Sequence, residues 1–234
     1  MPLSEDLRAL QERVVGELVA AHDYYTNTKF AWRIVQKVID SNTKFTIRNK
    51  ITGSVTDQTA LSTHIEEYIQ KELAEATFQQ FISTFESFFF DFLRLWLTAY
   101  PRSLGGKKVD VKFILDAPDK DAILQHAIGK ELNEVMYERP SAWFAYLDEK
   151  VKLDCPSADE IERLAEAKAA RDVLVHNRGV VGKSYALKAG RCARYQEGDR
   201  MDIAEPYHRE TWDLLQKVVA DLSAAGLAKA PLAV

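Results

Sequence analysis

One segment, residues 78–97, constrains the fold of this chain more than any other. Its large apolar side chains recur at the i, i+3, i+4, i+7 spacing of one helix face. A helix with so wide an apolar face has to be covered by other helices, so the spacing predicts the central helix of an all-α protein. The residues on this face are Phe78, Phe81, Ile82, Phe85, Phe88, Phe89, Phe92, Leu93 and Trp96.

Three further apolar residues of the segment, Phe90, Leu95 and Leu97, lie off this face, which suggests a subunit interface. The segment also contains polar residues in a number that excludes a membrane span. They are Gln79, Gln80, Glu86, Asp91 and Arg94.

The pattern of apolar residues and helix-ending residues predicts an all-helical bundle with one short insertion. We expect helices over residues 4–25, 28–39, 63–100, 119–137, 141–153 and 206–226, with the third starting at a capping box on Thr63. Residues 41–57 alternate between apolar and polar and predict a short hairpin or ordered loop. Residues 109–113 favour a short strand or an extended link, and residues 180–203 an irregular segment with a small hairpin. We expect one continuous domain in which residues 1–58 pack on a core formed by residues 59–234.

Composition limits the function classes. The formal net charge of −4 excludes a general polyanion binder, so any contact with nucleic acid requires a local basic patch. The two cysteines, Cys155 and Cys192, have no paired spacing, which argues against zinc and against a disulfide framework and favours the cytoplasm. The first residues are acidic and lack a signal-type apolar stretch.

Residues 156–182 carry the strongest functional signal. Ser157 and Glu160 have capping-box spacing and Gly179 is placed to end the helix. A helical wheel predicts a buried face and, opposite to it, a polar face that includes Glu166. The expected buried residues are Ile161, Leu164, Ala165, Ala169 and Val175, and the other expected polar residues are Asp159, Glu162, Arg163 and Asn177.

Three ionisable residues, Arg171, Asp172 and His176, fall within or at the edge of the face expected to be buried. Because burying such groups is costly unless they are paired or hydrated, two interpretations are open. One is an ion-pair cluster at a packed helix end. The other is a wet cleft that a second copy of the helix closes, with Asp172 holding the imidazole four residues away.

A basic segment follows this helix. Between Val173 and Gln196 there is no acidic residue, while five cations predict contact with a polyanion; a solvated loop is the alternative. Tyr185 and Tyr195 are candidates for stacking on bases. The five cations are Arg178, Lys183, Lys188, Arg191 and Arg194.

The segment Arg171-Asp172-x-x-x-His176-Asn177-Arg178-Gly179 resembles the R-x4-6-H signature of the HEPN superfamily. With the aromatic helix before it, the segment is similar to the HEPN branch related to RiboL-PSP and other bacterial conflict-system proteins. The resemblance covers residues 60–225. It implies a HEPN-like antiparallel helical bundle, a homodimer, and an endoribonuclease that needs neither metal nor cofactor and acts in a toxin or antiphage defence role. An antitoxin or another defence-system protein is then a possible partner.

By this resemblance His176 is a general acid or base, Arg171 binds the scissile phosphate, Asp172 orients the pair and Asn177 helps to position the site. The products would carry a 2′,3′-cyclic phosphate. The chain departs from the HEPN toxins paired with a minimal nucleotidyltransferase, because Arg178 stands where those toxins have a tyrosine. Control by modification at that position is therefore not expected. The alternatives are a non-catalytic HEPN-like module that binds RNA, a nucleotide or a protein, and a structural helical scaffold.

Overall fold

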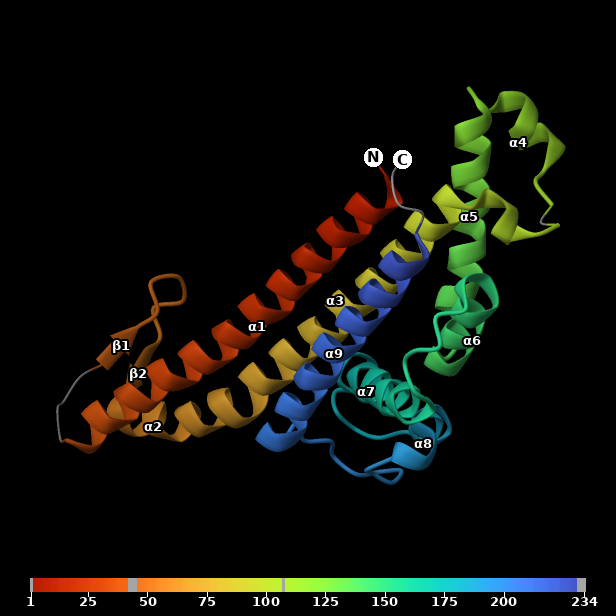
Figure 1. Cartoon of the computed structure of the whole chain (residues 1–234). Helices are drawn as coiled ribbons and strands as arrows, with labels where there is room; N and C mark the ends of the chain where they lie inside the picture. Colours follow the sequence, from red (N-terminus) through yellow and green to blue (C-terminus); the bar gives the residue numbers. More distant parts are fainter. Residues whose placement is uncertain (1, 42–45, 107, 231–234) are drawn as a thin grey trace.

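Three long helices lie side by side along the length of the molecule: α1 (Leu3–Asp40), α3 (Leu73–Ala99) and α9 (Glu205–Lys229) (Figure 1). The structure is a computed structural model that describes residues 2–41, 46–106 and 108–230. α1 runs antiparallel to α3, and the chain's two ends lie at the same end of the molecule (Figure 1). The all-α class predicted from the sequence is confirmed, since the only described strands form one two-stranded hairpin.

The predicted central helix is confirmed as α3. All nine residues of its expected apolar face are buried, from Phe78 at 0% exposed to Trp96 at 6%. α1, α9 and α7 (Ala158–Asn177) cover this helix, and α5 (Lys120–Met136) and α6 (Pro140–Val151) pack beside it near its end. Leu97 is also completely buried, and Phe90 packs edge-on against Trp143 with 5.0 Å between ring centroids. Leu97 is therefore covered by the chain's own helices, while Phe90 and Leu95 are partly buried.

The N-terminal region forms one helix where two were expected. α1 continues through the polar Thr26-Asn27-Thr28 sequence, where the hydroxyl of Thr26 donates to the carbonyl of His22 (3.1 Å) and Tyr25 is buried. Tertiary packing here outweighs a low local helix propensity. α1 contributes Leu7, Val14 and Leu18 to the main core, so the first part of the region before residue 58 belongs to that core.

The expected hairpin is confirmed by β1 (Thr46–Arg48) and β2 (Val55–Asp57), which are antiparallel. The following helix, α2 (Gln58–Glu67), starts earlier than predicted, because the carboxylate of Asp57 caps it by accepting from the N–H of Ala60 (2.9 Å). One π-helical turn (Tyr68–Glu72) joins α2 to α3. A small second core connects α2 to α1; it consists of Ile39, Leu61, Ile65 and Ile69, with Trp32 and Val35 packed against it.

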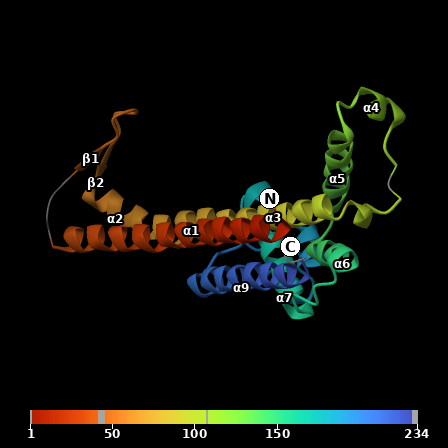
Figure 2. The same ribbon diagram turned by 45° about the horizontal axis from the view of Figure 1, so that its top comes forward.

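We call this end of the molecule, residues 26–41 and 46–72, the arm. Figures 1 and 2 show that the arm extends away from the other helices and that the hairpin projects from it. At the opposite end of α3, a 3-10 turn (Pro101–Leu104) leads to α4 (Val111–Asp116). The prediction of a strand or an extended link at residues 109–113 is wrong for its second half, because Asp110 caps a helix by accepting from the N–H of Lys112 (2.7 Å).

The last third of the chain matches the predicted order of elements with two differences. Residues 180–203 contain α8 (Lys183–Ala189) and a 3-10 turn (Gly190–Cys192), and the expected hairpin is reduced to one bridge between Val180 and Arg200. α9 continues past Gly226 to Lys229. Among the described residues, no helix is both long and apolar enough to cross a membrane.

Candidate functional site around helix α7

Helix α7 has the beginning and the end predicted from the sequence. Ser157 and Glu160 form a reciprocal capping box, in which the Ser157 N–H donates to the Glu160 carboxylate (2.8 Å). At the other end, Arg178 (φ 52°) and Gly179 (φ 78°) adopt left-handed conformations, and the Gly179 N–H donates to the carbonyl of Val173 (3.1 Å). This ending places His176 and Asn177 in the last turn.

Arg171 and Asp172 belong to a charged network that the structure closes within one chain. Arg171 donates to Asp172 (3.2 Å) and pairs with Glu86 of α3. Lys168 lies 3.2 Å from Glu86 and 3.6 Å from Asp172, and Lys188 lies 3.1 Å from Asp172. The network thus joins three cations to two carboxylates. Glu86 and Lys168 were not predicted as site residues from the sequence; the only signal for Glu86 was a carboxylate next to the apolar face of α3.

A cavity of about 650 Å³ opens beside this network. It is lined by Lys168 and Arg171 of α7, by the polar face of α3, which includes Glu86, and by Arg13 of α1, which donates to Asp91 (2.7 Å). The Nε atom of Arg171 is buried and has no hydrogen-bond partner among the described residues. Aromatic side chains complete the lining; they are Phe90, Tyr137 and Trp143.

His176 lies outside the network. Its side chain is exposed, and within the described part of the chain it makes no hydrogen bond or ion pair. The predicted contact between Asp172 and His176 is therefore absent, because the carboxylate of Asp172 is held by Arg171, Lys168 and Lys188. Asn177 and Arg178 are exposed next to His176. The structure thus brings Arg171 and Asp172 together and leaves the imidazole free at the helix end.

The helical wheel for α7 was wrong at two positions. Val175, expected inside, is 47% exposed, and Glu166, expected outside, is 2% exposed. Glu166 accepts hydrogen bonds from the hydroxyls of Tyr185 and Tyr207 (both 2.6 Å) and from Nε of Arg194 (3.0 Å). These partners satisfy a buried carboxylate that a wheel based on polarity alone places in solvent.

The Glu166 cluster also changes the interpretation of the basic segment. Arg194 lies with its guanidinium 3.2 Å from the ring centroid of Tyr207, and Tyr185 is only 1% exposed. Burial, together with the nearby Glu166, raises the pKa of both tyrosines above its usual value. Tyr185 is therefore a structural residue and is not available to stack on a base, while the hydroxyl of Tyr195 donates to the carbonyl of Asp202 (2.8 Å).

Three of the five predicted RNA-binding cations are paired with acids of α7. Lys188 contacts Asp172, Arg194 contacts Glu166, and Arg191 contacts both Glu162 and, at 3.2 Å, Asp159. The acids precede the basic segment in the chain, and α8 folds back beside α7 and brings the two together. Arg178 and Lys183 remain exposed, and no ion pair to either is found among the described residues.

The described residues contain no group of three or more His, Cys, Asp or Glu side chains that would hold a metal ion. Comparisons of the chain with protein-family models, with curated proteins and with solved structures found no match.

Proposed function

We propose that this chain is a HEPN-type endoribonuclease that acts without a metal ion, in the cytoplasm, as a toxin or an antiphage effector. The observation that carries the proposal is the free imidazole of His176 at the C-terminal end of α7, on the same helix as the Arg171 that lines the cavity. An exposed imidazole at the end of a helix is accessible to bound RNA and can act on it as a general acid or base.

RNA supplies its own nucleophile, so the protein has to move protons and stabilise negative charge. The 2′-oxygen forms a bond to the adjacent phosphorus and the bond to the 5′-oxygen breaks. His176 accepts the 2′-hydroxyl proton as general base and water protonates the leaving 5′-oxygen, which gives a 2′,3′-cyclic phosphate and a 5′-hydroxyl. Arg171 stabilises the charge on the phosphorane.

In the composite site that we propose, His176 of one chain and Arg171 of the other act on one phosphate. We therefore propose a homodimer in which the ends of two α7 helices meet across the RNA. Arg178 and Lys183, the unpaired cations next to this end, would bind neighbouring phosphates. Asp172 orients Arg171 through its 3.2 Å contact, a role that differs from orienting His176.

Glu86 competes with RNA for Arg171. The carboxylate of Glu86 occupies one terminal nitrogen of Arg171 and also contacts Lys168. An RNA phosphate has to displace this carboxylate or bind to the remaining guanidinium edge. This competition lowers the affinity of the resting protein for RNA without removing Arg171 from the site.

The test is cleavage of single-stranded and structured RNA in excess EDTA. His176→Ala and Arg171→Ala are expected to lower the cleavage rate by about 100-fold or more each, the usual size of a lost general acid or base or of a lost charge-stabilising group. Two exposed residues provide matched controls that should keep the wild-type rate: His64→Ala on α2 and Arg163→Ala on α7. Wild-type rates in both site variants would refute the nuclease.

A second function, a non-catalytic binding module, is favoured by one observation, the pairing of Arg171 with Glu86 and Asp172 inside a single chain. Such a module would bind RNA with a steep salt dependence and would show no turnover. Its affinity would fall on Lys183→Met and on Arg178→Met, while Arg171→Ala would have little effect.

A further inference from the structure

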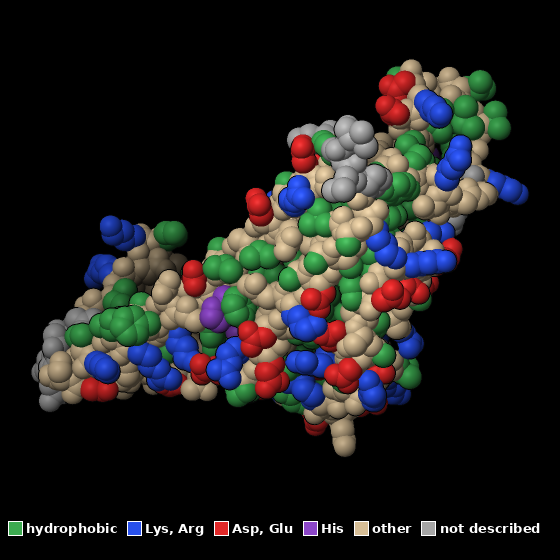
Figure 3. Space-filling view, viewed as in Figure 1, with side chains coloured by type: hydrophobic (Ala, Val, Ile, Leu, Met, Phe, Trp, Pro, Cys, Tyr) green, Lys and Arg blue, Asp and Glu red, His purple; other side chains and the backbone are tan. Residues whose placement is uncertain are grey.

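The outer side of the arm carries an unpartnered apolar stripe. Phe30, Ile34 and Val38 follow one another at four-residue spacing along α1 and are 68%, 47% and 41% exposed. At 100° per residue they span about 80° of the helix surface, close to the width that one packed helix covers. The hairpin beside α2 adds Ile47, Val55 and, at 96% exposed, Ile51. In Figure 3 hydrophobic side chains gather on the arm next to groups of Lys and Arg.

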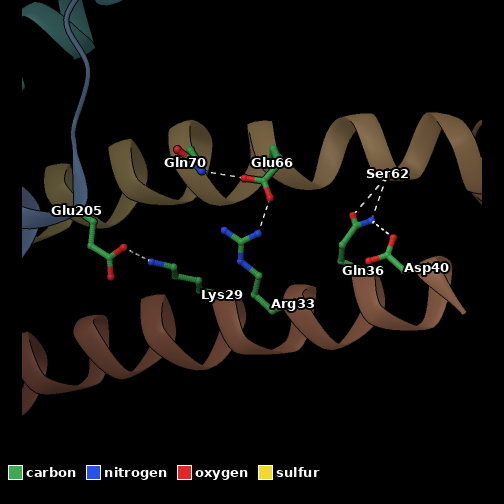
Figure 4. A network of polar contacts seen from close by, with 8 residues as sticks. All are labelled: Lys29, Arg33, Gln36, Asp40, Ser62, Glu66, Gln70 and Glu205. Carbon is green, nitrogen blue, oxygen red and sulfur yellow. Dashed lines mark hydrogen bonds and ion pairs between the residues drawn. The ribbon is translucent and has the colours of Figure 1, made fainter.

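The arm does not use this stripe to fold. Trp32, Val35 and Ile39 of α1 face the small core shared with α2. A third side of α1 carries polar contacts, in which Arg33 pairs with Glu66 and Gln36 donates to Ser62 (3.1 Å), as Figure 4 shows. With two sides of α1 fixed to the rest of the molecule, the stripe is presented on a well-supported helix and is free to be covered by another molecule.

Basic side chains without an ion pair lie around the stripe. Lys37 lies about 20° from Phe30 around the helix, and Arg48 and Lys50 lie on the hairpin; within the described ranges none of the three forms an ion pair. Of the nearby acids, Asp40 accepts a hydrogen bond from Gln36 (2.9 Å) and Asp57 caps α2. The arm contains six Lys or Arg and five Asp or Glu, so its formal charge is +1, whereas the whole chain carries −4. A complementary surface is therefore apolar and acidic.

We propose that the arm binds an acidic amphipathic helix of a partner protein, which packs along Phe30, Ile34 and Val38. The stripe is a ridge at four-residue spacing, the pattern by which helices pack on one another. RNA is less well suited, because bases stack on aromatic rings and Phe30 is the only aromatic residue of the stripe. A second copy is also disfavoured, since a two-fold contact through this surface would bring Lys37 and the hairpin cations of both copies together.

The experiment measures binding of a fluorescently labelled synthetic peptide to the full chain by anisotropy. The probe is an amphipathic helix with leucine on one face and glutamate on the other. Two control peptides replace the glutamates by lysine or the leucines by serine. The wild-type protein is expected to bind the Leu/Glu peptide and neither control. Phe30→Ser and Ile34→Gln are expected to weaken binding by about tenfold or more each, because each replaces an apolar side chain of the contact by a polar one.

Tyr24→Ser is the matched control, since Tyr24 is 58% exposed on the same helix but lies outside the stripe, and this variant should bind as the wild type does. Thermal unfolding verifies that every variant is folded. The proposal is overturned if the Leu/Glu and Leu/Lys peptides bind equally or if the stripe variants bind like wild type. It is also overturned if Phe30→Ser converts a dimer into a monomer, or weakens RNA binding while leaving peptide binding unchanged. Because no readout depends on cleavage of RNA, its failure is separate from failure of the nuclease.

Discussion

His208 is a buried histidine that its surroundings hold in the neutral form. It is 1% exposed, its Nε2 lies 2.8 Å from the hydroxyl of Thr77, and its ring stacks on Tyr25 with 4.1 Å between centroids. Burial is the main cause that lowers the pKa of His208 to about 4, with a smaller contribution from His22. Glu205 opposes this shift and Lys29 adds to it.

This histidine makes the stability of the fold depend on pH. Its folded pKa of about 4 is below the unfolded value of about 6.5, so the unfolded chain binds more protons between these pH values. The contribution of His208 is complete above pH 6.5 and decreases as the pH falls toward 4. We expect the free energy of unfolding to be about 2 kcal/mol lower at pH 5 than at pH 7 from this residue. Urea unfolding at both pH values measures this difference in the free energy of unfolding.

In the His208→Gln variant the difference in the free energy of unfolding between pH 5 and pH 7 is expected to be smaller by about 2 kcal/mol. The variant is also expected to be less stable than wild type at pH 7. An identical pH dependence in wild type and His208→Gln would contradict the assignment.

At this scale the sequence predicts the local part of the candidate site only. The capping box and the Arg171 to His176 segment are contiguous, so their placement on one helix could be predicted from spacing. Glu86 precedes Arg171 by 85 residues, and Tyr207 follows Glu166 by 41. Only the tertiary fold brings these residues together. The wheel placed Glu166 in solvent because it could not include the hydroxyls that satisfy it.

At the scale of elements, the contact between α3 and α9 depends on a glycine inside a helix. A Cβ atom on Gly226 would lie 2.8 Å from two ring atoms of Phe92 and 3.5 Å from Leu7. Gly226 was expected from the sequence to end α9, because glycine often follows the last turn of a helix. Its role in the structure is to let the two helices approach closely.

Gly226→Ala is therefore expected to lower the free energy of unfolding by about 1–3 kcal/mol, the usual range for overpacking a core. Gly16→Ala is the matched control, since Gly16 is also inside a helix but has nothing within 4 Å of its Cβ position. It should raise stability by about 0.5–1 kcal/mol through helix propensity. Two chemical denaturation curves test the pair, and a stabilised Gly226→Ala variant would show that α9 does not need this close approach.

The helix with a strong apolar period was predicted correctly, whereas the boundaries of α1 and α2 were not. The nine apolar residues of α3 were all correctly placed in the core. The start of α2 was set by Asp57, a weaker sequence signal than the capping box at Thr63, and α1 continued where three polar residues suggested a break. The start of α2 thus follows a local cap, whereas α1 continues because contacts with the arm's small core, which spacing does not encode, hold its second half.

At the scale of the whole molecule, the proposed nuclease requires two chains, and this requirement can be tested by complementation. If a composite site uses Arg171 of one chain and His176 of the other, a mixed dimer of Arg171→Ala and His176→Ala contains one intact site. Mixing the two inactive proteins in equal amounts should then restore about a quarter of wild-type cleavage, because half of the dimers are mixed and each has one site of two.

The control mixes Arg171→Ala with the double variant, which contains no intact Arg171 and should remain inactive. Analytical ultracentrifugation establishes that the mixed proteins exchange subunits. Dimers that exchange without recovering any cleavage would contradict a site shared in this way.

The uninterrupted course of α1 has a mechanical consequence. At 38 residues it is a rod of about 57 Å, anchored in the main core by Leu7 and in the arm by Ile39. A rod without a hinge transmits torque along its length instead of absorbing it. A displacement of the arm is therefore transmitted to α3, which packs along α1 and carries the Glu86 carboxylate that pairs with Arg171.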